Sequence, residues 1–223
     1  MSSNLAFGNL DWAEIAVATG QTLEMLGGSL VLTLLFGLPL GVILHLTGPG
    51  RLLANRPAHA VLSLLVNGLR SLPFIILLIL MIPATMLLVG TSLGVLGAIP
   101  PLVVGAAPFY ARLVESALRE VEGGVIEASQ AMGATTGQIV FGALLPEATP
   151  GLIAGATVTA VALVSYTAMA GVVGAGGLGD LAIRFGYQRF QTDVMVVTVA
   201  LLILLVQGLQ IVGDRLVAHF SRR

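Results

Sequence analysis

Five stretches of this sequence are long and almost wholly apolar, which limits the chain to folds that suit a lipid bilayer. A helix needs about 20 mainly apolar residues to cross the hydrocarbon core of a membrane. Only 9% of the 223 residues are charged and the mean hydropathy is +1.00, whereas soluble domains carry about 25% charged residues. The sequence therefore predicts an all-α polytopic membrane protein with five transmembrane helices. The predicted spans are Thr22–Leu46, His59–Met81, Gly94–Ala117, Gly151–Val173 and Asp193–Val212.

The third span is interrupted by residues that weaken helices. They are Gly97, Pro100, Pro101, Gly105 and Pro108. Such residues are tolerated in a membrane helix when neighbouring helices satisfy the freed backbone groups. We therefore expect the third span to be buried in the helix bundle rather than to face lipid.

The arginines predict the orientation, because the chain contains no lysine. Basic residues favour the cytoplasmic side of a membrane. One side carries the larger group: Arg51, Arg56, Arg112, Arg119, Arg215, Arg222 and Arg223. The other side carries Arg184 and Arg189, in the connection between the last two spans. We therefore expect the N-terminus outside and the C-terminus in the cytoplasm.

Composition argues against several classes of function. The net charge of −1 does not favour a nucleic-acid partner, and a chain without cysteine forms neither disulfides nor thiolate sites. The first 20 residues contain no Arg or Lys, so we expect no cleavable signal peptide there. No internal repeat or linker is evident. Residues 1–223 are therefore predicted to form a single transmembrane domain with a cytoplasmic loop at about 118–147.

The start of this loop is predicted to prolong the third span as a helix. Arg112 and Glu115 are three residues apart, and Glu115 and Arg119 are four apart. Opposite charges at these spacings stabilise a helix. The helix is then expected to break at Gly123 and Gly124, because paired glycines favour a turn.

Two short helices are predicted in the rest of the loop. Val125–Met132 is expected to form the first, and Gly133 allows the tight turn that follows it. Thr135 or Thr136 is expected to cap the second helix. Pro146 is expected to hold the residue before it in an extended or turn-like backbone before the fourth span begins.

The same loop resembles the signature loop of the permeases of binding-protein-dependent ABC importers. The matching positions are Glu127, Ala128, Ser129, Gly133, Leu145 and Pro146. Two positions depart from the family pattern, since Ser129 replaces a second alanine and Ala143 stands where isoleucine is usual. The first change exchanges one small residue for another and the second removes an apolar contact, so the turn chemistry is retained.

A narrower resemblance, to the permease subunit of methionine ABC importers, extends over nearly the whole chain after about Thr19. Four further segments carry it: Arg70–Leu77, Val89–Gly94, Val104–Phe109 and Gly174–Gly179. Gly174–Gly179 is also predicted to form a tight turn at the outer surface. No nucleotide-binding pattern accompanies it, so this chain is not expected to be an enzyme or to hold a cofactor.

The resemblance implies the fold and mechanism of a type I ABC importer permease in the bacterial cytoplasmic (inner) membrane. Two copies of the permease form a pathway for methionine, as the D- or L-isomer, towards the cytoplasm. Each copy docks through the signature loop on one subunit of an ATPase homodimer, which uses ATP and Mg. An extracytoplasmic binding protein delivers the substrate, and lipid surrounds the helices.

Three residues are candidates for the pathway. Arg70 lies deep in the second span, where an ionisable group is a functional-site hypothesis by default; it either faces a substrate carboxylate or bonds backbone carbonyls near Pro73. Met169 is the largest side chain in the run of small residues after Tyr166, and it either closes the pathway or simply packs. Tyr166 is the third candidate.

Other classes of function remain as alternatives. The same architecture serves importers of other amino acids or small solutes. A secondary transporter driven by an ion gradient would need paired ionisable groups near the membrane midplane and usually a repeated architecture, and neither is evident. An intramembrane enzyme would need a nucleophile with a base, or a metal cluster. The three histidines are widely spread and lack the spacing of metal ligands, so no metal site is expected.

Overall fold

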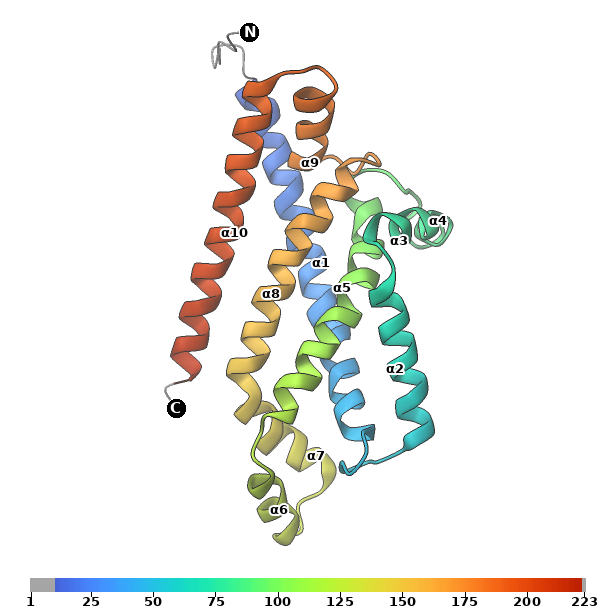
Figure 1. The fold of residues 1–223 in the computed structure, drawn as a ribbon, viewed down its shortest axis with the longest axis vertical. Helices are drawn as coiled ribbons and strands as arrows, with labels where there is room; N and C mark the ends of the chain where they lie inside the picture. Colours follow the sequence, from blue (N-terminus) through green and yellow to red (C-terminus); the bar gives the residue numbers. More distant parts are fainter. Residues whose placement is uncertain (1–10, 222–223) are drawn as a thin grey trace. The chain divides into compact units, whose positions relative to one another are not determined.

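The computed structural model describes residues 11–221, which are almost entirely helical (Figure 1). The first ten residues, together with Arg222 and Arg223 of the predicted basic C-terminus, lie outside the described residues. The elements are α1 (Trp12–Thr47), α2 (Arg56–Ser71), α3 (Phe74–Leu80), α4 (Ile82–Val89), α5 (Gly94–Arg119), α6 (Gly123–Ala131), α7 (Thr136–Ile139), the π-helical turn η2 (Val140–Leu144), α8 (Leu145–Gly171), α9 (Gly177–Leu181), the π-helical turn η3 (Ala182–Tyr187) and α10 (Thr192–Phe220).

Four of these helices are long and apolar enough to cross a membrane, and a bent pair brings the number to five. The four are α1, α5, α10 and the continuous helix Thr136–Gly171, which joins α7, η2 and α8. The bent pair is α2 with α3. The predicted all-α polytopic fold is therefore confirmed.

The second predicted span, His59–Met81, is wrong as a single helix. The chain bends by 104° between α2 and α3, and Pro73 stands at the bend with ψ 131°. Proline disfavours the helical conformation of the residue before it, so α2 ends at Ser71. At 1.5 Å per residue the 16 residues of α2 reach only about 24 Å, which is less than the hydrocarbon thickness of about 30 Å.

The prediction for the third span is confirmed. Helix α5 continues through its prolines without a break, and half of its most apolar segment is buried, the largest share among the four long helices. Its glycines allow close contact. A Cβ atom on Gly97 would lie 2.5 Å from the backbone of Ser92, and one on Gly105 would lie 3.2 Å from the ring of Phe74.

The chain divides into two compact units. Among the described residues, unit 1 comprises residues 11–32, 72–105 and 160–209, and unit 2 comprises residues 33–71, 106–159 and 210–221. Helices α1, α5, α8 and α10 contribute residues to both units. The division therefore does not test the predicted single transmembrane domain, which stays a prediction.

In unit 1, side chains of α1 satisfy the start of α9. The Gln21 side-chain carbonyl accepts a hydrogen bond from the Gly177 N–H at 2.8 Å, and the Thr22 hydroxyl accepts one from the Leu178 N–H at 2.9 Å. The first N–H groups of a helix have no partner within the helix, so these contacts hold α9 against α1. The buried core beside them consists of Ile15, Ala18, Leu178, Leu181 and Val194.

In unit 2, a buried cluster joins α5 to the loop that follows it. Its members are Leu46, Tyr110, Val114, Leu118, Val121, Ile139, Val140, Leu144 and Ala148. Helix α1 approaches α5 closely at Gly41, where a Cβ atom would lie 2.5 Å from the Val114 Cβ and from the Ala111 carbonyl oxygen. Small residues permit such contacts between membrane helices, where packing rather than water exclusion drives association.

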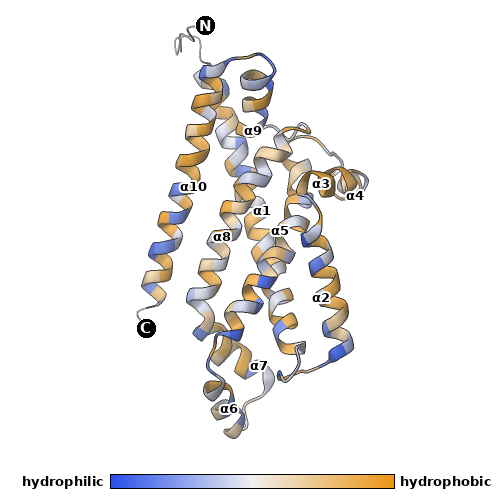
Figure 2. Ribbon diagram, in the orientation of Figure 1, coloured by the Kyte–Doolittle hydropathy of each residue, from blue (hydrophilic) through white to orange (hydrophobic). Residues whose placement is uncertain are grey.

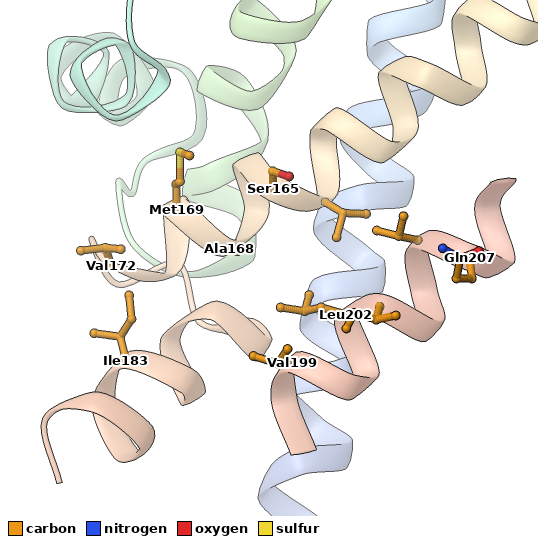
Figure 3. A pocket seen from close by; sticks show the side chains of 11 residues that line it. Ser165, Ala168, Met169, Val172, Ile183, Val199, Leu202 and Gln207 are labelled. Atoms are coloured by element: carbon orange, nitrogen blue, oxygen red, sulfur yellow. The ribbon is translucent and has the colours of Figure 1, made fainter. Parts of the chain in front are cut away.

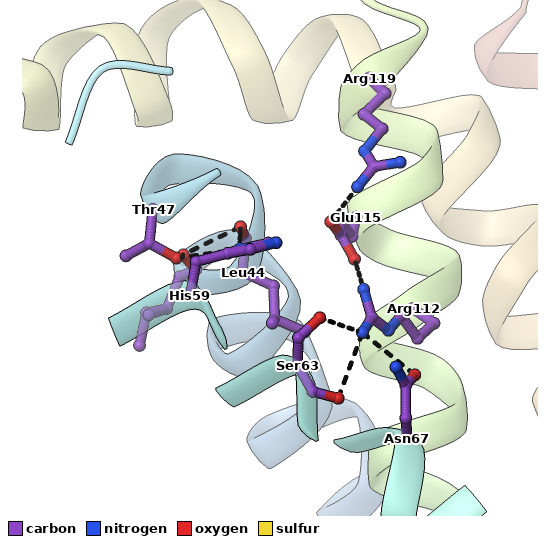
Figure 4. A network of polar contacts seen from close by, with 9 residues as sticks. Leu44, Thr47, His59, Ser63, Asn67, Arg112, Glu115 and Arg119 are labelled. Atoms are coloured by element: carbon purple, nitrogen blue, oxygen red, sulfur yellow. Dashed lines mark hydrogen bonds and ion pairs between the residues drawn. The ribbon is translucent and has the colours of Figure 1, made fainter. Parts of the chain in front are cut away.

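A buried carboxylate fixes the end of α5 that leads into the loop (Figure 4). Glu115 is 3% exposed and forms ion pairs with Arg112 and Arg119, as predicted from their spacing. Arg112 also donates to α2, reaching the Ser63 hydroxyl and, at 3.0 Å, the Asn67 side-chain carbonyl. The charge of Glu115 thus organises α2 and α5 of unit 2 around one polar network.

Replacing Gly41 with alanine should destabilise the protein. The added methyl group overlaps Val114 and the α5 backbone, and overpacking costs about 1–3 kcal/mol. Thermal unfolding in detergent should show a lower midpoint for Gly41→Ala. Gly68→Ala is the matched control because a Cβ atom there meets nothing within 4 Å. Equal midpoints for the two variants would contradict the close contact.

Replacing Glu115 with glutamine should cost more than replacing one of its partners. Glu115→Gln leaves Arg112, whose side chain is 18% exposed, without its counter-charge, and breaking a buried ion pair costs about 3–5 kcal/mol. Arg119 is 57% exposed, so Arg119→Gln should cost under about 1 kcal/mol. The unfolding midpoints of the two variants test this order, and the reverse order would refute it.

Candidate functional site

The loop between α5 and α8 begins with a helix that has a well-defined end. Helix α6 holds Glu127, Ala128 and Ser129. Beyond it, Gly133 has φ +78°, a left-handed conformation that glycine adopts without strain. The Gly133 N–H donates to the Gln130 carbonyl and the Ala134 N–H to the Ser129 carbonyl, which is the hydrogen-bond pattern of a Schellman motif. The predicted turn at Gly133 is confirmed.

The break before α6 is not at the predicted position. The sequence predicts a break at Gly123 and Gly124, but these residues form the first turn of α6. Helix α5 instead ends at Arg119, and Val121 lies between the helices with 8% of its surface exposed. Burial of Val121 in the unit 2 cluster turns the chain before the glycines are reached.

The second short helix, α7, is capped by Thr135. The Thr135 hydroxyl accepts from the Gln138 N–H, and the Gln138 side chain accepts from the Thr135 N–H at 2.8 Å. This reciprocal arrangement is a capping box. It selects Thr135 from the two threonines proposed as caps. The first predicted short helix is confirmed as α6, whereas the second is wrong as a separate helix, because Thr135 caps the start of one helix that runs from Thr136 to Gly171.

The expectation for Leu145 and Pro146 is wrong. Leu145 is helical, with φ −66° and ψ −44°, and α7 continues through η2 into α8 as one helix. The Leu145 N–H donates to the Val140 carbonyl, five residues back. A π-helical turn shifts the hydrogen bonds by one residue, so Pro146, which lacks an N–H group, follows it without ending the helix.

The six signature residues differ in exposure. Glu127, Ala128, Gly133 and Pro146 are exposed or partly exposed at the surface of the loop, whereas Leu145 packs against the unit 2 cluster. The Ser129 hydroxyl donates to the Val125 carbonyl at 2.8 Å, which keeps that side chain on its own helix. The surface members are therefore available for a partner, and Leu145 attaches the loop to its own unit.

Two exposed apolar side chains were not singled out from the sequence. Met132 is 81% exposed and Phe141 is 76% exposed, although Val140 and Leu144 near Phe141 are buried. Apolar side chains exposed singly are common on protein surfaces, so the exposure of these two does not by itself assign them a function. The sequence offered one indication that Phe141 is exposed: it is a phenylalanine in a segment predicted to lie in the cytoplasm.

A polar pocket of about 370 Å³ lies at the base of the loop in unit 2. Glu127 and Gln130 of α6 line it together with His45 and Arg51. No sequence pattern linked Arg51 to Glu127, because the two residues are brought together only by folding. The pocket gives the loop a second polar surface beside its exposed helix.

The pathway candidates lie in different surroundings. Met169 is 43% exposed and lines an apolar pocket of unit 1, whereas Tyr166 stacks on Phe74 with ring centroids 4.5 Å apart. Arg70 belongs to unit 2 and lies in the last turn of α2. Its guanidinium carbon lies 5.8 Å from the centroid of the Phe109 ring, a cation–π contact that neither sequence alternative included.

The glycine-rich segment Gly174–Gly179 forms a turn only as far as Gly176, because Gly177–Gly179 begin α9; its predicted place at the outer surface stays a prediction. Gly174, Gly176 and Gly177 all have positive φ. Among residues 11–221, no group of three His, Cys, Asp or Glu side chains could hold a metal ion.

Comparisons with known proteins identify relatives that match most of the chain. The model of the family described as "Binding-protein-dependent transport system inner membrane component" matches residues 37–223. The probable D-methionine transport system permease protein MetI of Vibrio cholerae is 51% identical over 94% of this chain and 93% of its own length. The methionine import system permease protein MetP of Bacillus subtilis is 48% identical, over 97% of this chain and 98% of its own.

A solved structure gives the same result. An inward-facing structure of the MetNI methionine ABC transporter includes a chain that matches with a TM-score of 0.92 and 47% identity, over 99% of both chains. The resemblance predicted from the signature loop and the four further segments is therefore confirmed. This chain belongs to the family of inner membrane components of binding-protein-dependent transport systems.

Proposed function

We propose that this chain is the permease subunit of an ATP-driven ABC importer that moves methionine, as the D- or L-isomer, into the cytoplasm. The observation that carries the proposal is the likeness to the MetNI transporter over 99% of the chain at 47% identity. The names of the relatives from two different bacteria support the same substrate. Importers of other amino acids with this fold are the nearest alternative.

The proposed partners are a second copy of the permease, a cytoplasmic ATPase homodimer and an extracytoplasmic methionine-binding protein. ATP and Mg act in the ATPase, and this chain carries out no catalysis. The loop suits the ATPase contact because α6 ends in a Schellman motif and α7 begins with a capping box. A loop with both ends fixed passes on a displacement that a flexible loop would absorb.

The proposed orientation places the N-terminus outside and the C-terminus in the cytoplasm of the inner membrane. The basic residues Arg51, Arg56 and Arg119 then face the cytoplasm, in agreement with the preference of arginine for that side. The signature loop lies on the same side and meets the ATPase there. Met169, Tyr166 and Arg70 are proposed pathway residues, with Met169 as the closing side chain.

The proposal is tested by transport in reconstituted vesicles. The permease is co-purified with its ATPase partner, and ATP-dependent uptake of L- and D-methionine is measured with the binding protein present. We expect accumulation of methionine that competing amino acids of other side-chain classes do not reduce. Accumulation of another solute, without methionine uptake, would refute the proposed substrate.

Replacing Gly133 with alanine should weaken coupling. A residue with a Cβ atom at φ +78° is strained by about 1–2 kcal/mol, so the end of α6 loosens. Methionine uptake per ATP hydrolysed should fall. Gly137→Ala is the control, since this glycine lies in α7 and a Cβ atom there meets nothing within 4 Å. Equal coupling in both variants would contradict the lever role of the loop.

Replacing Met169 with alanine should open the pathway if Met169 closes it. The shorter side chain leaves space among small residues, so ATP hydrolysis without uptake, or leakage of methionine from loaded vesicles, should rise. Met86→Ala is a suitable control because Met86 is similarly exposed, at 53%, and lies in α4. Leakage equal to that of the unchanged protein would leave Met169 with a packing role alone.

A further inference from the structure

Four exposed side chains lie at the end of unit 1 where α10 begins: Trp12, Tyr187, Arg189 and Phe190. The three aromatic side chains are largely exposed. The start of α1, which carries Trp12, shares a buried core with α9 and with the start of α10. All four residues therefore belong to the same end of unit 1, and they are called the aromatic patch below.

Phe190 has a backbone conformation that lacks a compensating contact. Its φ is +58°, which is unusual for a bulky residue. The turn around it is fixed, because the Gln191 N–H donates to the Phe185 carbonyl at 3.1 Å and the Gln188 N–H donates to the Ile183 carbonyl at 2.9 Å. The Phe190 side chain is nevertheless 85% exposed. Strained residues persist where their surroundings hold them in place, so the contact that uses this ring has to come from outside the described residues.

Arg189 adds a cation without a counter-charge to the patch. Its guanidinium carbon lies 4.5 Å from the centroid of the Phe185 ring, which holds the side chain beside the turn. The nearby Arg184 is paired with Glu14 and Asp180, whereas Arg189 takes part in none of the ion pairs formed in the described part of the chain. A guanidinium group binds phosphate through two parallel hydrogen bonds, so Arg189 suits a phosphate-bearing partner.

The position of the patch favours a membrane as that partner. Phe190 lies two residues before α10, which is hydrophobic along most of its length (Figure 2). Val196, Ala200 and Leu204 are exposed at intervals of four residues on this helix. They do not line the groove that holds Met169 (Figure 3). This apolar face of α10 suits lipid, and the patch stands at its end, where hydrocarbon gives way to headgroups.

The types of residue in the patch agree with this position. Tryptophan and tyrosine are enriched where the hydrocarbon of a membrane meets water. The chain contains one tryptophan and three tyrosines. Tyr110 is buried, and Tyr166 stacks on Phe74. The single tryptophan, Trp12, and the one largely exposed tyrosine, Tyr187, both belong to the patch.

We propose that the aromatic patch anchors unit 1 in the headgroup layer of a phospholipid membrane. Its three aromatic rings lie at the boundary with the acyl chains. The Arg189 guanidinium donates hydrogen bonds to a lipid phosphate. Only 11% of the most apolar segment of α10 is buried, and interfacial anchors help to set the tilt and rotation of a membrane helix. The anchor requires a chain that spans a membrane, and it does not depend on the proposed substrate.

Tryptophan fluorescence tests the depth of the patch. The full-length permease is reconstituted in phosphatidylglycerol vesicles that contain lipids brominated either just below the headgroup or near the end of the acyl chain. Bromine quenches tryptophan on contact. In the natural chain, Trp12 should be quenched more strongly by the lipid brominated below the headgroup. Phe190→Trp in a Trp12→Phe background should give the same order.

Leu204→Trp in the same Trp12→Phe background is the matched control. Leu204 is exposed and lies about 18 Å along α10 from Thr192, at 1.5 Å per residue. It should therefore be quenched more strongly by the lipid brominated near the chain end. The natural chain and the two variants together distinguish a position at the interface from a general exposure to lipid.

Arg189→Gln tests the phosphate contact. Added to the protein with Phe190→Trp, it should weaken quenching by the lipid brominated below the headgroup, because the turn loses its phosphate. The loss should be absent in vesicles of a diglucosyl diacylglycerol, whose headgroup has no phosphate. Arg189→Lys should retain much of the quenching in phosphatidylglycerol. Gln188→Ala is the control, since Gln188 is an exposed neighbour without charge.

Two results would overturn the anchor. The first is that neither brominated lipid quenches Trp12 or the tryptophan introduced by Phe190→Trp, while acrylamide in the water quenches both fully. The second is that the extracytoplasmic binding protein protects these tryptophans from acrylamide and brominated lipids leave them unquenched, which would assign the patch to that protein. An equal loss of quenching by Arg189→Gln in vesicles with and without phosphate would refute the role of Arg189.

Discussion

The requirement that backbone N–H and C=O groups be paired inside hydrocarbon determines most of this structure. Helices satisfy it within one segment, so the apolar stretches become helices even where prolines and glycines occur. In α5, neighbouring groups pack against Gly97 and Gly105, and the helix continues. At Pro73 the same requirement has a different outcome, because α2 ends and α3 begins in a new direction.

The loop between α5 and α8 is polar and is predicted to lie outside the hydrocarbon. Side-chain contacts and capping hydrogen bonds therefore hold it in place. Hydrogen bonds around Gly133 end its short helix α6, and those around Thr135 begin the helix that continues into α8. The Val121 and Ile139 side chains anchor it in the buried cluster of unit 2, and Glu115 with its two arginines fixes the end of α5 before it. The signature residues are thus presented on a supported surface.

The sequence was sufficient for the features that depend on local chemistry. The apolar stretches, the spacing of Glu115 and its arginines, the turn at Gly133 and a threonine cap at Thr135 or Thr136 all follow from residue type and position. The bend at Pro73 had a local signal as well, but the length of the apolar stretch suggested a single span. The roles of Glu127, Met169, Arg70 and Tyr166 stay predictions, because their effects depend on partners.

The remaining features depend on contacts between residues far apart in the chain. Arg112 meets Ser63 and Asn67, which lie 49 and 45 positions away, and no local pattern indicates this pairing. Likewise, Arg51 and Glu127 line one pocket only because of the fold. The π-helical turn at Val140–Leu144 had no signal in the sequence, because its two buried residues, Val140 and Leu144, are four positions apart, a spacing that equally fits a regular α-helix.

The π-helical turn η2 has a consequence for how α8 can move. It inserts one additional residue at the base of a helix that otherwise runs unbroken from Thr136 to Gly171, and one residue corresponds to a rotation of about 100° around the axis. If the turn tightens to ordinary helical geometry when α7 is pushed, α8 must rotate as well as shift. A linear displacement of α7 would then become a rotation of the membrane-spanning part of α8.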